Sequence, residues 1–152
     1  MAPKLFDNSW ETTATSAIGL IEQALAQLGH DPEACELESP TTLRSWWFSQ
    51  GSATITVALR RRPGTPHLRV STPVMTPGTG SDRLALHADL LARNLELCGM
   101  AFALDGDKVL LVSERSTLDL DRSEVIELVA GLAREADAVD DKLVASYGGR
   151  LG

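Results

Sequence analysis

The stretch from Ser81 to Leu97 is leucine-rich with helical spacing, and it constrains the fold more than any other part of the sequence. At about 100° per residue, its apolar side chains fall on two opposed faces: Leu84, Ala88, Leu91 and Leu95 on one, and Leu86, Leu90 and Leu97 on the other. A helix that packs on a sheet needs only one apolar stripe. The second face therefore requires a cover of its own.

Two covers for the face of Leu86, Leu90 and Leu97 are open. One is the last predicted helix, or a loop, of the same chain. The other is a second copy of the chain, in an isologous interface where Leu86 and Leu90 meet their own mates near a two-fold axis. Because three leucines exposed together are a liability for a monomer, we expect a homodimer, with interface residues Leu86, Leu90, Arg93 and Leu97.

The remaining elements follow from periodicity and from turn and cap residues. Helices are predicted from about Ser9 to Leu28 and from Asp121 to about Tyr147, with Asn8–Glu11 and Asp121–Glu124 as capping boxes and Ser81 as the cap of the leucine-rich helix. Strands are predicted over 44–50, 53–61, 67–75, 100–104 and 108–113. His30 to Thr42 reads as a loop with room for a short extended piece, and Pro73 marks a sheet edge or a strand end.

This order, α-β-β-β-α-β-β-α, predicts a single α+β domain over residues 1–152. We expect a mostly antiparallel five-stranded sheet packed with three helices.

Charge is distributed unevenly along the chain. The formal net charge is −7, which disfavours binding to nucleic acid or to an anionic membrane surface. Residues 41–83 nevertheless hold six arginines and one acidic residue, whereas residues 1–40 hold seven acidic residues and one lysine. Either the basic strands face acidic helices and solvent, or the middle of the chain binds an acidic segment of a partner.

Two adjacent tryptophans in the first predicted strand point to opposite faces. One of Trp46 and Trp47 can enter the core, and the other needs a cover or serves as a contact. Beside them, Thr56, Ala58 and Arg60 lie on the non-core side of the next strand. We expect Trp47, Thr56, Ala58 and Arg60 to form a surface for an extended peptide. The alternative is that a terminus or the loop from His30 to Thr42 covers it.

No catalytic, metal-binding or cofactor motif stands out. His30, His67 and His87 lack metal-pair spacing, and Asp105-Gly106-Asp107 is a hairpin turn rather than a calcium loop. An enzyme would need a deep polar pocket that the fold alone would have to supply. Cys35 and Cys98 are expected as free, buried thiols. Without a signal peptide or an apolar span, the chain is expected in the cytoplasm, with no cofactor.

The pattern from Leu90 onward resembles a known superfamily. "LLARN" (Leu90–Asn94) leads into "LELCGMAFALDGDKVLLVSER" (Leu95–Arg115), and a capped helix follows over Leu120–Ala145. This is similar to the type III secretion chaperone-like proteins, including CesT-type chaperones and YbjN-like proteins. The resemblance implies a small acidic homodimer without catalytic activity that holds an extended client segment. Its YbjN-like branch implies instead a regulatory or stress-related domain that binds a protein target without a secreted client.

Overall fold

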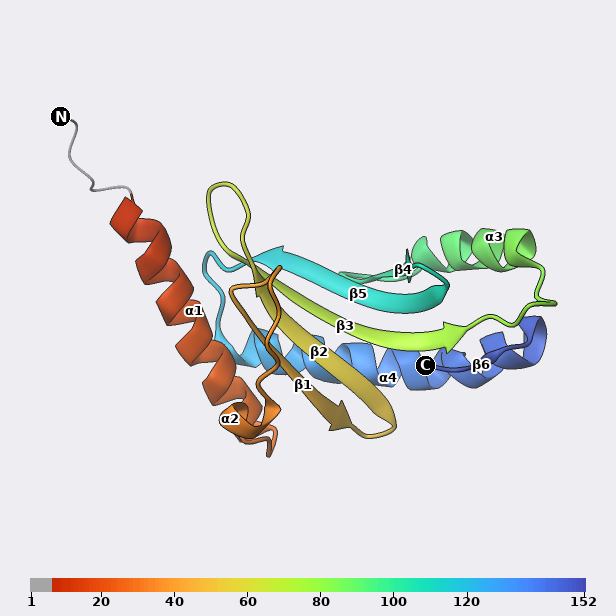
Figure 1. The fold of residues 1–152 in the computed structure, drawn as a ribbon, viewed down its shortest axis with the longest axis horizontal. Helices are drawn as coiled ribbons and strands as arrows, with labels where there is room; N and C mark the ends of the chain where they lie inside the picture. The colour runs from red at the N-terminus through yellow and green to blue at the C-terminus, as the bar shows by residue number, and fades with distance from the viewer. Residues whose placement is uncertain (1–6) are drawn as a thin grey trace.

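The computed structural model describes residues 7–152, within which four helices and six strands are found (Figure 1). Their bounds are α1 Asp7–Gln27, α2 Pro32–Cys35, β1 Arg44–Gln50, β2 Ala53–Arg60, β3 His67–Thr76, α3 Arg83–Asn94, β4 Ala101–Asp105, β5 Lys108–Ser116, α4 Arg122–Tyr147 and β6 Arg150–Leu151. The strands form one antiparallel sheet in the spatial order β1-β2-β3-β5-β4, and β6 pairs with β3. The α+β class and the order of the predicted elements are confirmed.

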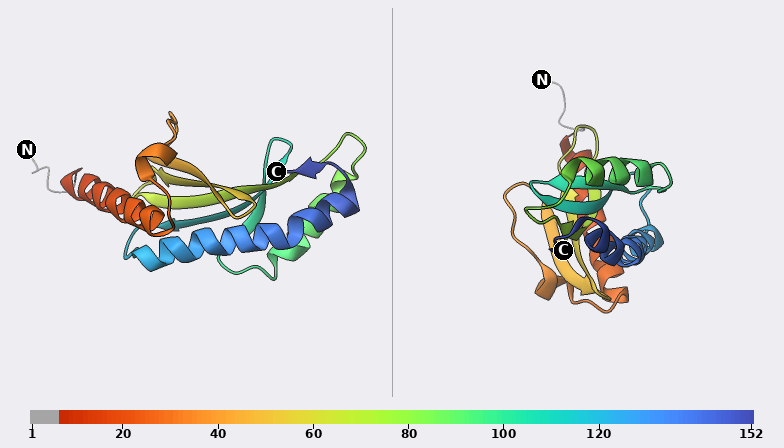
Figure 2. Two further views of the ribbon diagram at one scale, coloured as in Figure 1. Left: turned by 90° about the horizontal axis from the view of Figure 1, so that it is seen from below. Right: turned by 90° about the vertical axis from the view of Figure 1, so that its right-hand side faces the viewer.

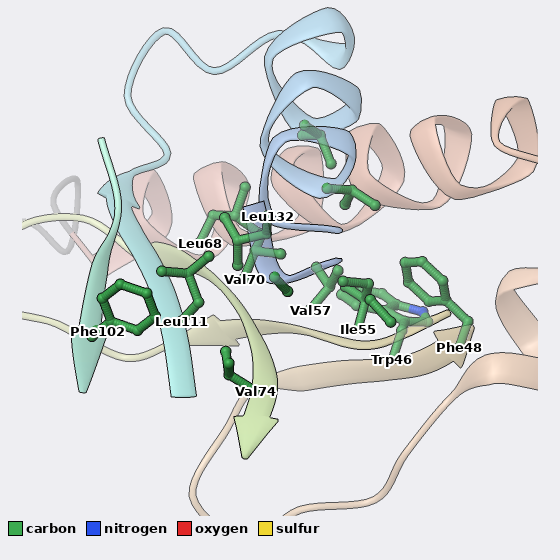
Figure 3. Close-up of a cluster of buried hydrophobic side chains, with 14 of the residues drawn as sticks. Trp46, Phe48, Ile55, Val57, Leu68, Val70, Val74, Phe102, Leu111 and Leu132 are labelled. Atoms are coloured by element: carbon green, nitrogen blue, oxygen red, sulfur yellow. The ribbon is translucent and has the colours of Figure 1, made fainter. Parts of the chain in front are cut away.

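One face of the sheet carries the core. The apolar stripe of α4 is buried against it, and Figure 2 shows α4 running along one side of the strands. A close-up of this layer shows one cluster of buried side chains, which includes Trp46, Phe48, Ile55, Val57, Leu68, Val70 and Leu111 of the strands and Leu132 of α4 (Figure 3). Helix α1 adds Ile21 and Leu25 to the same core. We call this the inner face of the sheet, and its opposite the outer face.

The long helix α4 begins as its sequence predicts. The Asp121 side chain accepts a hydrogen bond from the Glu124 N–H at 2.9 Å, and the Asp121 N–H donates to the Glu124 carboxylate at 2.9 Å. This capping box satisfies two backbone donors that no helical carbonyl can reach. Arg115 at the end of β5 also binds Glu124, at 2.6 Å. The start of α4 is therefore fixed to the sheet.

Several predicted details are wrong. Helix α1 already includes Asp7 and Asn8, so Asn8 lies within the helix rather than ahead of a start at Ser9. Asp82, and not Ser81, caps α3, which ends at Asn94 rather than Leu97. Cys98 is exposed and Cys35 half-buried, although both are free as predicted.

Two short elements were not predicted. The loop from His30 to Thr42 contains the one-turn helix α2, and β6 follows α4 to pair with the end of β3. Pairing of β6 depends on Gly149, which has φ +106° and packs so tightly on Thr76 that a Cβ would overlap its carbonyl oxygen. The prediction that Pro73 marks a sheet edge or a strand end is wrong, because Pro73 lies within β3 opposite Leu110 of β5, beyond the last residue paired with β2.

Asn94 connects α3 to the edge strand β4. The Phe102 N–H donates to Asn94 Oδ1 at 2.7 Å, and Asn94 Nδ2 donates to the Phe102 carbonyl at 3.3 Å. One side chain thus satisfies both backbone groups of an edge residue that has no neighbouring strand on that side. The last residue of the "LLARN" motif fixes the angle at which α3 leaves the sheet.

We predict that Asn94→Ala lowers the free energy of unfolding by about 1–2 kcal/mol, because it leaves two partly buried backbone groups without partners. Urea denaturation followed by circular dichroism measures the loss. Glu96→Ala, two residues further on at an exposed position, is the matched control. Equal stability of the two variants would show that the Asn94 hydrogen bonds contribute nothing to the fold.

Candidate protein-binding surfaces

The structure buries the face of α3 that was predicted to contact a second copy of the chain. Leu86 and Leu90 are 0% and 5% exposed within the single chain, and they belong to the core cluster that includes Phe102 and Leu143. Leu97 is half-buried against the same core. The prediction that Leu86 and Leu90 form an interface with a second copy is therefore wrong, because the same polypeptide covers them.

The opposite face of α3 is the uncovered one. Leu84, Leu91 and Leu95 are 82%, 71% and 84% exposed, and Ala88 between them is exposed as well. Ala88, Leu91 and Leu95 lie within roughly 40° of Leu84 around the helix axis. We call this the α3 stripe. An apolar stripe of this kind on a single chain indicates a site for a macromolecular partner.

A polar network fixes the orientation of the α3 stripe. Arg93 binds the Asp89 carboxylate through Nε at 2.9 Å, and the Tyr147 hydroxyl of α4 donates to the same carboxylate at 2.9 Å. Burial raises the pKa of Asp89, but the hydrogen bonds from Arg93 and Tyr147 and the charge of Arg93 outweigh it, so the pKa lies below its ordinary value. The Tyr147–Asp89 hydrogen bond holds α3 to the end of α4. Arg93, predicted at the interface, pairs with Asp89 within α3, on the side of the helix away from the stripe.

The second candidate surface is the outer face of the sheet. Strand pairing places Trp47, Thr56, Ser71 and Val112 side by side in one row across β1, β2, β3 and β5. The next row holds Ser45, Ala58, Arg69 and Glu114, and the row after it holds Arg60, His67 and Ser116. The four residues predicted to contact a peptide, Trp47, Thr56, Ala58 and Arg60, are therefore brought together on one face.

Their exposures differ. Trp46 is buried in the core, whereas Trp47 is 53% exposed, so the prediction that the two tryptophans part to opposite faces is confirmed. Ala58 is buried and forms the floor of the face, not a contact residue. Thr56 and Arg60 are half-buried. Trp47 is the large apolar side chain that this part of the face offers to a partner.

The loop from His30 to Thr42 covers only the Ser45 end of this face and leaves Trp47 exposed. It runs beside β1, where the Leu37 N–H donates to the Ser45 carbonyl at 2.8 Å and Ser45 Oγ donates to the Leu37 carbonyl at 2.7 Å. The loop therefore occupies part of the β1 edge. The other predicted cover was a chain terminus. Residues 1–6 at the N-terminus lie outside the described part of the structure.

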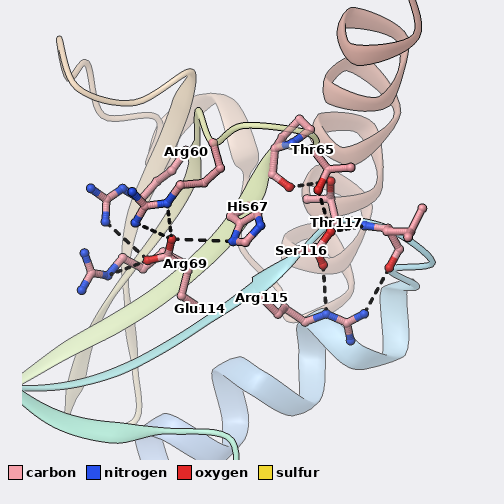
Figure 4. A network of polar contacts seen from close by, with 11 residues as sticks. Arg60, Thr65, His67, Arg69, Glu114, Arg115, Ser116 and Thr117 are labelled. Carbon is pink, nitrogen blue, oxygen red and sulfur yellow. Dashed lines mark hydrogen bonds and ion pairs between the residues drawn. The ribbon is translucent and has the colours of Figure 1, made fainter.

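Three arginines surround one carboxylate on the outer face (Figure 4). Arg62 binds Glu114 at 2.8 Å, Arg60 at 3.4 Å and Arg69 at 3.6 Å, and His67 Nδ1 lies 3.8 Å away. We call this group the arginine cluster. Burial raises the pKa of Glu114, but the hydrogen bond and charge of Arg62, with the charges of Arg60 and Arg69, hold it below its ordinary value.

Three hollows and several ionisable groups complete the description of residues 7–152. One hollow of about 570 Å³ lies between residues 36–40 and 42–44, and two smaller ones adjoin Trp10 and Ser52. Within residues 7–152, no group of three or more His, Cys, Asp or Glu side chains is placed to hold a metal ion. The groups with shifted pKa values belong to ion pairs and helix caps, and none of them lines these three hollows.

Over residues 18–151 the chain matches the family described as type III secretion system (YopN, CesT) and YbjN peptide-binding chaperone 1. The chain belongs to this family. The resemblance to type III secretion chaperone-like proteins, with their CesT and YbjN branches, is thereby confirmed. No curated protein gives a significant match.

Solved structures share the fold of this family member. The ExsC–ExsE complex is 14% identical, covering 85% of this chain and 94% of that chain, with a TM-score of 0.62. The HopA1–SchA chaperone–effector complex is 14% identical, covering 91% and 99%, with a TM-score of 0.60. The Yersinia pestis type III secretion chaperone SycH, in complex with a fragment of YscM2, is 23% identical, covering 80% and 97%, with a TM-score of 0.54. Among the described residues, no helix has the length and apolar character to cross a membrane.

We predict that Glu114→Gln lowers the free energy of unfolding by about 1 kcal/mol at pH 7, because the arginine cluster loses its counter-charge. The pKa of Glu114 is lowered in the folded state, so its stabilisation is complete above the unfolded pKa and is lost as pH falls through the folded pKa. The difference from the parent chain should therefore vanish in acid.

Urea titrations at several pH values between neutral and strongly acidic measure this difference. Glu127→Gln, an exposed position on α4, is the control. A difference between Glu114→Gln and the parent chain that stays constant into acid would contradict the assignment of the lowered pKa.

Proposed function

We propose that this chain is a non-enzymatic, dimeric chaperone that holds an extended segment of a client protein on the outer face of its sheet. The observation that carries the proposal is this open face, with Trp47 exposed beside Thr56 and no helix of residues 7–152 layered over it. The chain's membership of a peptide-binding chaperone family supports the same function. The domain is taken to span residues 1–152 and to work in the cytoplasm, in keeping with its free thiols.

Backbone groups at both sheet edges are already hydrogen-bonded, which favours a client that rests on the face over one that adds a strand at an edge. A peptide can join a sheet by adding a strand at an edge, or it can rest on the face. At the β1 edge, Ser45 is already paired with Leu37, and at the β4 edge Asn94 occupies both backbone groups of Phe102. The outer face carries no such obstruction at Trp47. The client need not be a secreted protein, since nothing in this geometry depends on secretion.

The α3 stripe supports the dimer. A two-fold axis near Leu91 would bring each stripe onto its own copy, so that Leu84 of one chain approaches Leu95 of the other. Both stripes would then be removed from water at once. We therefore propose the homodimer expected from sequence through this opposite face of α3, with Leu84, Leu91 and Leu95 in place of Leu86, Leu90, Arg93 and Leu97.

We predict that Leu91→Glu converts the dimer to a monomer, because it places two like charges and two desolvated carboxylates at the axis. Light scattering coupled to size exclusion, at tens of micromolar chain, gives the mass. Leu118→Glu, at a leucine that is exposed away from α3, should leave the mass unchanged. A parent chain that already runs as a monomer would refute the dimer.

Leu90→Ala tests the corrected assignment of the two faces. Leu90 is buried in the core of its own chain, so we predict a loss of about 2–5 kcal/mol in the free energy of unfolding with no specific effect on dimer mass. Leu91→Ala, its exposed neighbour, should weaken the dimer and hardly affect monomer stability. Thermal unfolding and light scattering on both variants separate the two outcomes.

Peptide binding is tested with a displayed library of random, unstructured twelve-residue peptides. We expect selected peptides to bind the parent chain and to lose at least tenfold in affinity with Trp47→Ala, measured by fluorescence anisotropy. Leu118→Ala removes an exposed apolar side chain elsewhere and serves as the control. Failure of any peptide to be selected would contradict a chaperone of extended segments.

A further inference from the structure

The arginine cluster is under-neutralised. Three guanidinium groups, of Arg60, Arg62 and Arg69, share the single carboxylate of Glu114. Each arginine side chain also keeps part of its surface exposed, from 27% for Arg60 to 42% for Arg62. Positive charge in excess of its counter-charge is thus presented on the outer face of a chain whose formal net charge is −7.

The cluster is in register with Trp47. Along β2 the side chains that point outward are Thr56, Ala58 and Arg60, spaced about 7 Å apart because alternate residues share a face. Trp47 is directly opposite Thr56, Arg69 is opposite Ala58, and His67 is opposite Arg60. An extended segment lying along β2 would therefore direct one side chain to Trp47 and the second and fourth residues after it to the arginines.

The basic end of the face continues into a hollow. Arg61 stacks its guanidinium 4.3 Å from the ring centroid of Trp10 on α1, and a space of about 400 Å³ is lined by Trp10, Arg61, Arg62, Pro63 and Gly64. Arg62 belongs both to this hollow and to the arginine cluster. Arg62 thus extends the positive charge past Arg60 toward α1.

We propose that the extended segment held by this face is acidic, with carboxylates two and four residues beyond an apolar residue, and that the arginine cluster recognises those carboxylates. This inference rests on the proposed function and adds the chemical class of the client segment. Glu114 keeps the guanidinium groups together and competes with the client for them. The acidic remainder of the chain repels such a segment elsewhere, so charge directs it to this one face.

The experiment uses three fluorescein-labelled peptides that differ at two positions. Each carries one central leucine in a Ser/Thr background, with Glu, Gln or Lys at the second and fourth residues after it. Anisotropy titrations against the full chain should give at least tenfold tighter binding for the Glu peptide than for the Gln peptide, and the weakest binding for the Lys peptide. Raising NaCl from 50 to 300 mM should remove most of the preference.

Variants of the chain locate the effect. The preference for the Glu peptide should be abolished in a triple variant of the cluster, Arg60→Gln, Arg62→Gln and Arg69→Gln. The control triple variant makes the same change of charge on α4, with Arg122→Gln, Arg134→Gln and Lys142→Gln. It should preserve the preference. Glu114→Gln should tighten binding of the Glu peptide severalfold, because a competing carboxylate is removed. If the cluster served only to stabilise the fold, Glu114→Gln would instead weaken binding of the Glu peptide. If the triple variant at the cluster does not fold, Arg69→Gln alone takes its place.

The outcomes separate the two proposals. Equal affinity for the Glu and Gln peptides, with binding lost in Trp47→Ala, would overturn the acidic client and leave the chaperone function standing. No binding of any peptide, including those selected from the library, would overturn both. Tighter binding of a single-stranded oligonucleotide than of the Glu peptide would also overturn the inference, by assigning the cluster to nucleic acid.

Discussion

Burial of the apolar stripe of α4 against the inner face of the sheet is the interaction on which the rest of the structure depends. Val125, Val129, Leu132 and Leu143 of α4 meet side chains from the central strands, and the Asp121–Glu124 capping box fixes where the helix begins. Helices α1 and α3 then complete the same core. Because hydrophobic burial scales with apolar area, this long contact commits the sheet to one covered face and leaves the other open.

That asymmetry produces both candidate surfaces. The outer face presents Trp47 next to the arginine cluster. On α3, the stripe of Leu84, Leu91 and Leu95 faces outward because Leu86 and Leu90 are buried in the core. One surface suits an extended segment with acidic residues, and the other suits a second copy of the chain. They involve different elements of the fold, so a dimer through α3 would leave the face around Trp47 accessible.

The sequence predicted the outer face better than it predicted the α3 interface. In a strand, alternation has only two phases, so once Ile55, Val57 and Leu59 are assigned to the core, Thr56 and Arg60 must face away. On α3 the two apolar faces have similar composition, and a helical wheel gives no reason to choose between them. The convergence of Arg60, Arg62 and Arg69 on Glu114 was not predicted either, because Glu114 is 45 or more residues away in sequence from each of them.

By itself, the sequence determined the elements and which side of each strand is apolar, because periodicity and capping act over a few neighbouring residues. Two short elements, α2 and β6, were not predicted. The first is a single turn that packs on β1, and the second pairs with β3, more than 70 residues earlier in the chain, so neither leaves a periodic pattern in the sequence. Only the tertiary structure decided which face of α3 remains in contact with water. That choice is made by how α3 packs between β4 and the end of α4, where Asn94 and Asp89 hold it in place.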